Sequence, residues 1–171
     1  AAALSLDLEM ATMAEDSVLI AGSNAEIAEV IGVAMQMPGD AILATLEPLI
    51  DDLAARYAAP LAATAPVLAT LTDLGVWQGV ATNDGIVAAE RRLEQLGWRS
   101  PFARVLGYDS GFGAKPEPGM LHESARRAGV MITDVLFVGD SETDRRTAAA
   151  AGCDFLVVGP DEPLDMVLSR F

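Results

Sequence analysis

Three carboxylates follow directly after an apolar run in the stretch VLFVGDSETD, residues 135–144. The run suits a protein interior, and Asp140, Glu142 and Asp144 come next to it in the chain. Carboxylates at the end of a buried strand can bind Mg²⁺ through one or two oxygens and leave room for water and phosphate. The same acids could instead complement the positive N-terminal end of a following helix. The stretch therefore indicates either a metal site or the start of a helix.

Two further polar signals have residue types that suit a phosphate group. Thr82 and Asn83 end the stretch VWQGVATN, and Lys115 in GAKPEPG is the only lysine among eleven cationic residues. Thr82 and Asn83 could equally cap the helix expected from residue 86, and Lys115 could lie on a solvated loop. Taken together, a hydroxyl, a compact positive charge and a carboxylate pair suit phosphoryl transfer, which needs mainly orientation and charge neutralisation.

Other reactive residue types have simpler explanations. His122, the only histidine, lies among Glu123, Arg126 and Arg127, which indicates a solvated helix face rather than a catalytic base. Cys153 stands among small and apolar residues and is expected to be packed. The stretch GYDSG departs from the G-x-S-x-G pattern of a hydrolase nucleophile, and the glycines fit neither a P-loop nor a dinucleotide fingerprint.

The elements that must position these residues alternate from about residue 60 onward. Apolar runs predict strands, and the segments between them have helical periodicity. The strands are expected at 76–83, 103–108, 135–140 and 154–159, and the helices at 86–97, 116–129, 142–152 and 163–171. Such alternation predicts parallel βαβ units in an open, doubly wound sheet. Ligands collect beyond the carboxyl ends of such strands, where Thr82, Lys115 and Asp140 are expected to meet.

The first part of the chain has a different pattern. Residues 24–37 and 40–60 read as helices, the second kinked or broken near Pro48, while LSLDLE at 4–9 suits a short strand or a helix. The sequence therefore predicts a small helical domain over 1–58, joined around 58–66 to an α/β core over 59–171.

Composition limits the kinds of ligand. The chain has 171 residues, a formal charge of −14 and one cysteine. Strong acidity argues against nucleic acid and acidic membrane surfaces, and no apolar run reaches the roughly 20 residues that span a bilayer. A single cysteine excludes a disulfide within the chain and favours a reducing cytoplasm. We expect a soluble cytoplasmic monomer or homodimer with a small-molecule ligand, and we expect Arg145 or Arg146 to offset the acidity near its site.

Three stretches resemble the signature motifs of one superfamily. VATN (80–83), GAKPEP (113–118) and VGDSETD (138–144) resemble the second, third and fourth motifs of the haloacid dehalogenase superfamily, over roughly residues 60–160. The pattern around Lys115 and the preceding helical module look most like the phosphoglycolate phosphatase and β-phosphoglucomutase branch. The resemblance implies a Rossmann-like parallel sheet core with a small helical cap.

The resemblance also implies roles for five residues. Thr82 would hydrogen-bond the phosphoryl oxygen with Asn83 beside it, and Lys115 would balance the charge of nucleophile and phosphate. Asp140 would bind Mg²⁺, and Asp144 would support the ion or its waters. The implied activity is Mg²⁺-dependent hydrolysis of a small phosphorylated metabolite, such as phosphoglycolate or a sugar phosphate, through an aspartyl-phosphate.

The first motif of that superfamily, D-x-D-G-T, is not found. Asp7-Leu8-Glu9 has the spacing of the two acids, but Met10-Ala11 stand where Gly-Thr belong. Three explanations stay open: the sequence begins inside the cap, the protein is a non-catalytic relative, or a degenerate site uses Asp7 as nucleophile.

Four other functions share parts of this pattern. A hydrolytic dehalogenase and a phosphoglucomutase share the fold, and a non-catalytic relative would keep the pocket only to bind phosphate and metal. A receiver-like regulatory domain also combines Asp, Thr and Lys around Mg²⁺, although its acid pair is expected early in the chain. Dependence on metal and turnover of a phosphate ester distinguish these functions.

Overall fold

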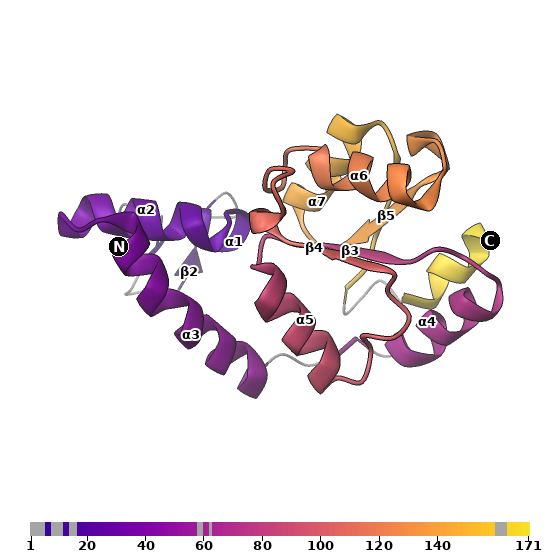
Figure 1. Ribbon diagram of the computed structural model, residues 1–171, viewed down its shortest axis with the longest axis horizontal. Coiled ribbons are helices and arrows are strands. Elements are labelled where there is room, and N and C mark those ends of the chain that lie inside the picture. Colours follow the sequence, from indigo (N-terminus) through magenta and orange to yellow (C-terminus); the bar gives the residue numbers. More distant parts are fainter. Residues whose placement is uncertain (1–5, 8–11, 14–16, 58–59, 62, 160–163) are drawn as a thin grey trace. The chain divides into compact units, whose positions relative to one another are not determined.

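The computed structural model describes the chain except for residues 1–5, 8–11, 14–16, 58–59, 62 and 160–163 (Figure 1). The chain divides into two compact units, Ala1–Ala58 (unit 1) and Ala59–Phe171 (unit 2). In the described parts of the chain, no helix is both long enough and apolar enough to cross a membrane.

The described residues of unit 1 form one short strand pair and three helices. Strands β1 (Leu6–Asp7) and β2 (Thr12–Met13) pair in antiparallel fashion. The helices are α1 (Val18–Ala21), α2 (Asn24–Met35) and α3 (Gly39–Tyr57). A capping box starts α2, in which Glu26 N donates to Ser23 Oγ at 3.3 Å and Ser23 N donates to Glu26 Oε2 at 2.7 Å. Two otherwise unpaired backbone donors are thereby satisfied, which fixes where the helix begins.

The second long helix runs through its proline. Helix α3 contains Pro48 and continues on both sides of it, so of the two expected outcomes the break does not occur, while the kink stays a prediction. A proline removes one backbone hydrogen bond and strains the preceding turn. Pro48 is exposed, and the remaining turns on either side still supply the hydrogen bonds that keep the helix continuous.

Unit 2 alternates helices and strands, as the sequence predicts. Its helices are α4 (Thr64–Asp73), α5 (Ile86–Gln95), α6 (Gly119–Ala128) and α7 (Glu142–Ala151). Its strands are β3 (Gly79–Ala81), β4 (Arg104–Leu106), β5 (Leu136–Gly139) and β6 (Asp154–Val157). Figure 1 shows α6 and α7 on one side of the strands and α4 and α5 on the other, so both faces of the strand layer are covered. Unit 2 is therefore an α/β core of the Rossmann-like kind.

The strands form two parallel pairs. Ala81 lies opposite Leu106 in the β3–β4 pair, and Val138 lies opposite Leu156 in the β5–β6 pair. A single open sheet was expected, but among the described residues β3 pairs only with β4 and β5 only with β6. The strands are also shorter than the apolar runs that predicted them, because only three or four residues of each run make ladder hydrogen bonds.

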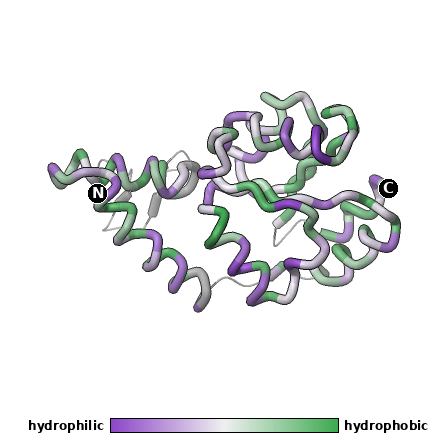
Figure 2. Tube along the Cα trace, in the orientation of Figure 1, coloured by the Kyte–Doolittle hydropathy of each residue, from purple (hydrophilic) through white to green (hydrophobic). Residues whose placement is uncertain are grey.

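The core of unit 2 follows from the alternation of side chains along β5. Leu136 and Val138 pack against the buried cluster that contains Val67 and Leu71 of α4, whereas Phe137 meets Phe155 with ring centroids 6.3 Å apart. Residues two apart in a strand share a face, so β5 presents apolar groups to both sides. Figure 2 shows the hydrophobic residues gathered along the strands in the middle of the unit.

In the described residues of unit 2, two connecting segments and the last element are 3₁₀ helices. They are η2 (Tyr108–Ser110), η3 (Ile132–Asp134) and η4 (Leu164–Arg170). The last of these lies where the sequence predicted a helix at the end of the chain, and Val167 from it is buried in the α4 cluster.

Candidate active site

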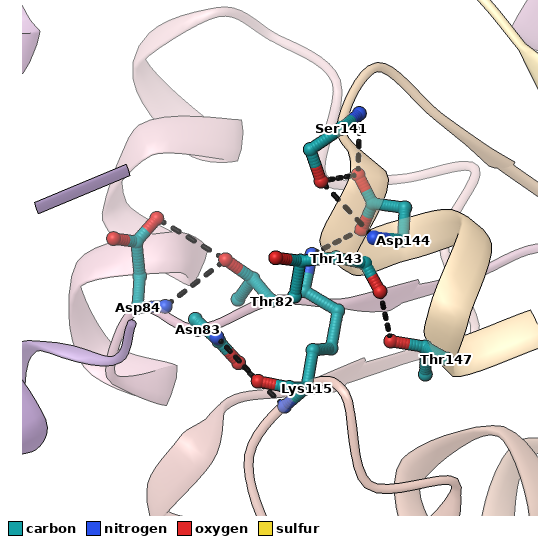
Figure 3. Close-up of polar contacts among 8 residues, drawn as sticks. All are labelled: Thr82, Asn83, Asp84, Lys115, Ser141, Thr143, Asp144 and Thr147. Atoms are coloured by element: carbon teal, nitrogen blue, oxygen red, sulfur yellow. Dashed lines mark hydrogen bonds and ion pairs between the residues drawn. The ribbon is translucent and has the colours of Figure 1, made fainter. Parts of the chain in front are cut away.

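The turn after β3 begins with Thr82, which the sequence analysis assigned to phosphate. Thr82 Oγ1 donates to Asp84 Oδ2 at 3.2 Å and accepts from Asp84 N at 3.1 Å. Neither Thr82 nor Asn83 is the N-cap of α5, since that position belongs to Gly85. The hydroxyl of Thr82 therefore shapes the turn that leaves the strand, and it lies beside Asn83 in Figure 3.

Asn83 holds the backbone of Lys115 with both ends of its side-chain amide. Asn83 Oδ1 accepts from Lys115 N at 2.7 Å, and Asn83 Nδ2 donates to Lys115 O at 3.0 Å. The two residues are 32 positions apart in sequence. Hydrogen bonds to both the N–H and the C=O of one residue fix the position and the orientation of its backbone, so Asn83 determines where the Lys115 side chain starts.

Lys115 reaches across the site to a buried carboxylate. Its Nζ lies 2.6 Å from Asp144 Oδ1, with side chains that are 15% and 6% exposed, and 5.9 Å from the centre of the Phe137 ring. Burial of the Asp144 carboxyl raises its pKa, but the charge of Lys115 and the hydrogen bonds from Lys115 and Ser141 outweigh this effect. The pKa of Asp144 consequently lies below its ordinary value of 3.8, and the carboxylate stays ionised beside the ammonium.

The second oxygen of Asp144 is held by the start of its own helix. Asp144 Oδ2 accepts from Ser141 Oγ at 2.6 Å and from Ser141 N at 3.2 Å, while Asp144 N donates to Ser141 Oγ at 3.0 Å. This is a capping box at the start of α7. The helix-start interpretation therefore applies to Asp144, which also binds Lys115 with its other oxygen (Figure 3).

Gly139, the last residue of β5, allows this packing. A Cβ atom added there would lie 2.6 Å from three atoms of the Asp144 side chain. Real Cβ atoms essentially never approach so closely, so a larger residue at position 139 would displace the carboxylate that holds Lys115.

Asp140 and Glu142 differ from Asp144 in their surroundings. Both are exposed, and Glu142 pairs with Arg145, whose Nε donates to Glu142 Oε2 at 2.7 Å. That pairing lowers the pKa of Glu142 through the hydrogen bond from Arg145. Asp140 directly follows β5 at the carboxyl end of the strand.

The residues present fit a cation only in part. Within the part of the chain that the structure describes, no three His, Cys, Asp or Glu residues cluster closely enough to hold an ion. Both oxygens of Asp144 already accept hydrogen bonds. Mg²⁺ commonly binds one or two carboxylates and completes its coordination shell with water and phosphate oxygens. Asp140 could bind such an ion directly, and Asp144 could contact it through a water molecule.

The remaining candidates lie on other residues of the two units. Asp7 ends β1 in unit 1, and its side chain lies outside the described residues. His122 is exposed on α6, as expected of a solvated face. Cys153 is half-buried, and burial raises the pKa of its thiol. Arg145 and Arg146 are both exposed on α7.

The sequence did not predict that residues of the loop after β4 hold the turn after β3 in place. Asp109, in η2, accepts a hydrogen bond from Ile86 N at 2.9 Å, which is the first residue of α5. Gly107 lies so close to the same turn that a Cβ atom would meet Asp84 O at 2.5 Å. The GYDSG stretch contained both, but no local pattern relates it to a helix that starts some twenty residues earlier.

Two curated relatives that match this chain are both named phosphoglycolate phosphatase. A phosphoglycolate phosphatase of Neisseria meningitidis is 37% identical over 97 residues, which are 57% of this chain and 41% of the relative. A phosphoglycolate phosphatase of Xanthomonas campestris is 34% identical over 134 residues, which are 71% of this chain and 61% of the relative. The chain thus spans about half the length of these two relatives.

Solved structures agree on the fold. A haloacid dehalogenase superfamily hydrolase from Geobacter sulfurreducens has a TM-score of 0.56 at 26% identity, covering 77% of this chain and 61% of that one. A haloacid dehalogenase hydrolase from Entamoeba histolytica has a TM-score of 0.70 at 13% identity, covering 95% of this chain and 76% of that one. The second likeness is evidence for the fold alone.

The family comparison agrees with the three motifs. The family model of haloacid dehalogenase-like hydrolases matches residues 6–158, which include the turn after β3, Lys115 and the start of α7. The resemblance that the sequence analysis noted at those positions is thereby confirmed. This chain belongs to the haloacid dehalogenase-like hydrolase family.

Proposed function

We propose that the protein is a Mg²⁺-dependent phosphatase that hydrolyses monoesters of small phosphorylated metabolites. The observation that carries this proposal is the buried Lys115–Asp144 pair, 2.6 Å apart, held beside the turn that follows β3. An ammonium fixed in this way offers a preorganised positive charge to a group that gains negative charge during reaction. Such a group is the transferring phosphoryl.

In this proposal four residues hold and orient the phosphoryl group. The Lys115 ammonium orients the phosphoryl oxygens and lowers their repulsion of an incoming carboxylate. Asp144 keeps that ammonium charged and in place, and Asn83 fixes the backbone from which it extends. Thr82, in the adjoining turn, would donate its hydroxyl proton to a phosphoryl oxygen in place of the hydrogen bond to Asp84 Oδ2. The substrate is thereby held in line before any bond changes, which accounts for a large part of the rate of such reactions.

Asp140 and Asp144 would hold Mg²⁺ in this proposal, Asp140 directly and Asp144 through water. When bound, the ion neutralises charge on the phosphoryl group. Support comes from the exposed position of Asp140 at the carboxyl end of β5, where ligands of parallel sheets collect.

The reaction would proceed through an aspartyl-phosphate. A carboxylate attacks phosphorus and the P–O bond to the ester oxygen breaks, and that oxygen takes a proton from water and leaves as an alcohol. A second water then attacks the acyl phosphate, which releases inorganic phosphate and regenerates the carboxylate. Asp7 is the candidate nucleophile that the sequence offers, and unit 1 would act as the cap that excludes water. Asp7→Asn tests this assignment: loss of turnover supports Asp7, whereas unchanged turnover assigns the attack to another carboxylate.

Phosphoglycolate is the first substrate to test, because the two curated relatives described above are both named for it. We expect the purified protein to release inorganic phosphate from phosphoglycolate or a sugar phosphate with Mg²⁺ present and to stop after EDTA. Release of halide from a 2-haloacid without metal would instead indicate a dehalogenase, and interconversion of sugar phosphates a mutase. Binding of beryllium fluoride without any turnover would indicate a non-catalytic relative.

A further inference from the structure

The loops that follow β3 and β4 are joined by backbone hydrogen bonds beyond the ends of the strands. Thr82 N donates to Leu106 O at 2.9 Å, which extends the ladder by one step past Ala81. Tyr108 N then donates to Asp84 O at 3.2 Å. The turn that carries Thr82 and Asn83 is thus attached to the neighbouring loop at two points, one before Asn83 and one after it.

The close approach of these loops depends on Gly107. This residue is buried, and a Cβ atom added to it would lie 2.5 Å from Asp84 O and 2.7 Å from Ile86 N. Its φ of −105° is open to any residue, so the requirement for glycine comes from the close approach and not from the backbone conformation.

A third contact fixes the far end of the turn. Helix α5 starts after Gly85, which has no side chain to cap it. Asp109 supplies the cap from 23 residues further along, since its Oδ1 accepts from Ile86 N at 2.9 Å. A carboxylate at a helix N-terminus satisfies an unpaired donor and complements the helix dipole. Ser110 Oγ accepts from Gly107 N at 2.7 Å and holds the loop that carries Asp109.

Four residues, Thr82 to Gly85, therefore lie between two fixed ends. One of them is Asn83, whose amide holds the backbone of Lys115. Because only a few backbone bonds separate Ile86 from Asn83, a displacement of the start of α5 would also displace the Asn83 amide. Asp109 is thus connected to Lys115 through a short series of hydrogen bonds, although no contact joins the two residues directly in the described structure.

We propose that Asp109 is a positioning residue, which caps α5 and so fixes the turn that places Lys115. The inference rests on the proposed function for its kinetic consequence, but its structural part stands on these hydrogen bonds alone. Asp109 would not touch the substrate. Its effect would pass through Ile86, the turn and Asn83 to the ammonium of Lys115.

The test compares Asp109→Ala with Asp109→Asn in the full chain. Asparagine keeps an acceptor of the same shape, whereas alanine removes it. The matched control is Thr64→Ala, which removes a side-chain hydrogen bond of 2.7 Å to Leu61 O at the start of α4 in the same unit. The readouts are the exchange rates of the Ile86 and Lys115 amides and, for activity, kcat and KM measured separately.

In Asp109→Ala we expect the Ile86 and Lys115 amides to exchange roughly fivefold faster or more, the size of a lost helix cap. We expect kcat to fall about tenfold, because the ammonium is displaced from the transferring group. Asp109→Asn should restore most of both values. Thr64→Ala should lower the melting temperature and leave the Lys115 amide and kcat unchanged.

Two results would overturn the inference. One is an unchanged Lys115 amide in Asp109→Ala although the Ile86 amide has lost its protection. The other is the same Lys115 response in Thr64→Ala, which would indicate general destabilisation. A native protein without phosphatase activity would refute the proposed function, while the exchange rates would still decide the role of Asp109.

Discussion

Lys115 joins three separate segments of the chain through its own atoms. Its backbone N–H and C=O both bind the side-chain amide of Asn83 after β3, and its ammonium binds the Asp144 carboxylate at the start of α7. Each partner is in turn held by its own element, Asp144 by Ser141 and Asn83 by the turn. A flexible four-carbon side chain normally loses much entropy when it is ordered. Anchoring at both ends means that this loss occurs on folding and not when a ligand binds.

Removal of the Asp144 charge should destabilise the fold in a pH-dependent way. Asp144→Asn leaves the Lys115 ammonium buried without its counter-charge, and we expect the free energy of unfolding to fall by about 3 kcal/mol at neutral pH. The folded state lowers the pKa of Asp144 below 3.8, so the native ion pair stabilises fully above that pH. Its contribution is lost as the pH falls through the lower, folded-state pKa.

Urea denaturation of both proteins at neutral pH and below pH 3.8 measures this difference. Asp154→Asn is the control, because Asp154 and Arg170 form an exposed pair with side chains 70% and 43% exposed. That variant should lose less than about 1 kcal/mol. A stability gap between native protein and Asp144→Asn that stays the same across the pH range would contradict the assignment.

Asn83 should matter for catalysis more than for affinity. Asn83→Ala removes both hydrogen bonds to the Lys115 backbone, and we expect kcat to fall by about 10- to 100-fold, since a misplacement of 1 Å is enough for such a loss. Asn83→Asp keeps the acceptor for Lys115 N and loses the donor to Lys115 O, so its kcat should lie between the two. Steady-state kinetics of the three proteins test this order, and a wild-type kcat in Asn83→Ala would refute it.

The sequence predicts the residue types of the site better than their contacts. Thr82, Asn83, Lys115 and Asp144 come from short motifs, and the structure brings Asn83, Lys115 and Asp144 into direct contact. The sequence could not predict that Asn83 binds backbone or that Asp144 has two partners. Both contacts depend on how segments about thirty residues apart are packed, and that information is not local.

The turn after β3 is held in position by the loop after β4, and Gly107 allows the two to touch. Gly107→Ala places a methyl group within 2.7 Å of three atoms, so the loops must separate. We expect a loss of about 1–3 kcal/mol in the free energy of unfolding, typical of overpacking, and a fall in kcat as the turn moves. Thermal and urea unfolding together with kinetics measure both effects.

Gly159→Ala is the matched control for that substitution. Among the residues that the structure describes, and leaving out the chain neighbours of Gly159, no atom lies within 4 Å of a Cβ added there, and its φ is outside the range that favours glycine. The change should alter stability by no more than about 0.5 kcal/mol. Equal losses in the two variants would show that the close approach at Gly107 has no special role.

The helices and strands of unit 2 were predictable wherever the hydrophobic periodicity and the residues that start or end an element agree. The helices α5, α6 and α7 begin and end within about three residues of the expected limits, and the four strands lie inside the apolar runs. Helix α4 was not predicted. Thr70 and Thr72 donate to Pro66 O and Leu68 O one turn earlier, which accommodates residues that usually favour turns.

The molecule combines a helical unit with an α/β unit, and each has its own internal contacts. Unit 2 contains the contacts among Asn83, Lys115 and Asp144. Unit 1 contains Asp7, the candidate nucleophile of the proposed reaction. The alternation of helices and strands predicted the layers of unit 2. The arrangement of its strands as two parallel pairs depends on which strand edges form hydrogen bonds, and local sequence patterns do not determine this.

The two units have different expected tasks, which follows from their residue types. Unit 1 is helical over most of its described length. In the proposed function unit 1 contributes the candidate nucleophile Asp7 and the cap, whereas unit 2 contributes Lys115 and its partners. Exchange of the helices of unit 1 for those of a relative, with Asp7 kept, should therefore change KM among substrates more than the dependence on Mg²⁺.

The most direct test of the central claim is the Mg²⁺ dependence of phosphate release in Asp140→Asn, compared with Glu142→Gln. Asp140 follows β5 at the proposed metal position, while Glu142 lies two residues away and pairs with Arg145. We predict that Asp140→Asn loses Mg²⁺-dependent phosphate release, by about 100-fold or more, and that Glu142→Gln keeps it. Full activity in Asp140→Asn would contradict the account.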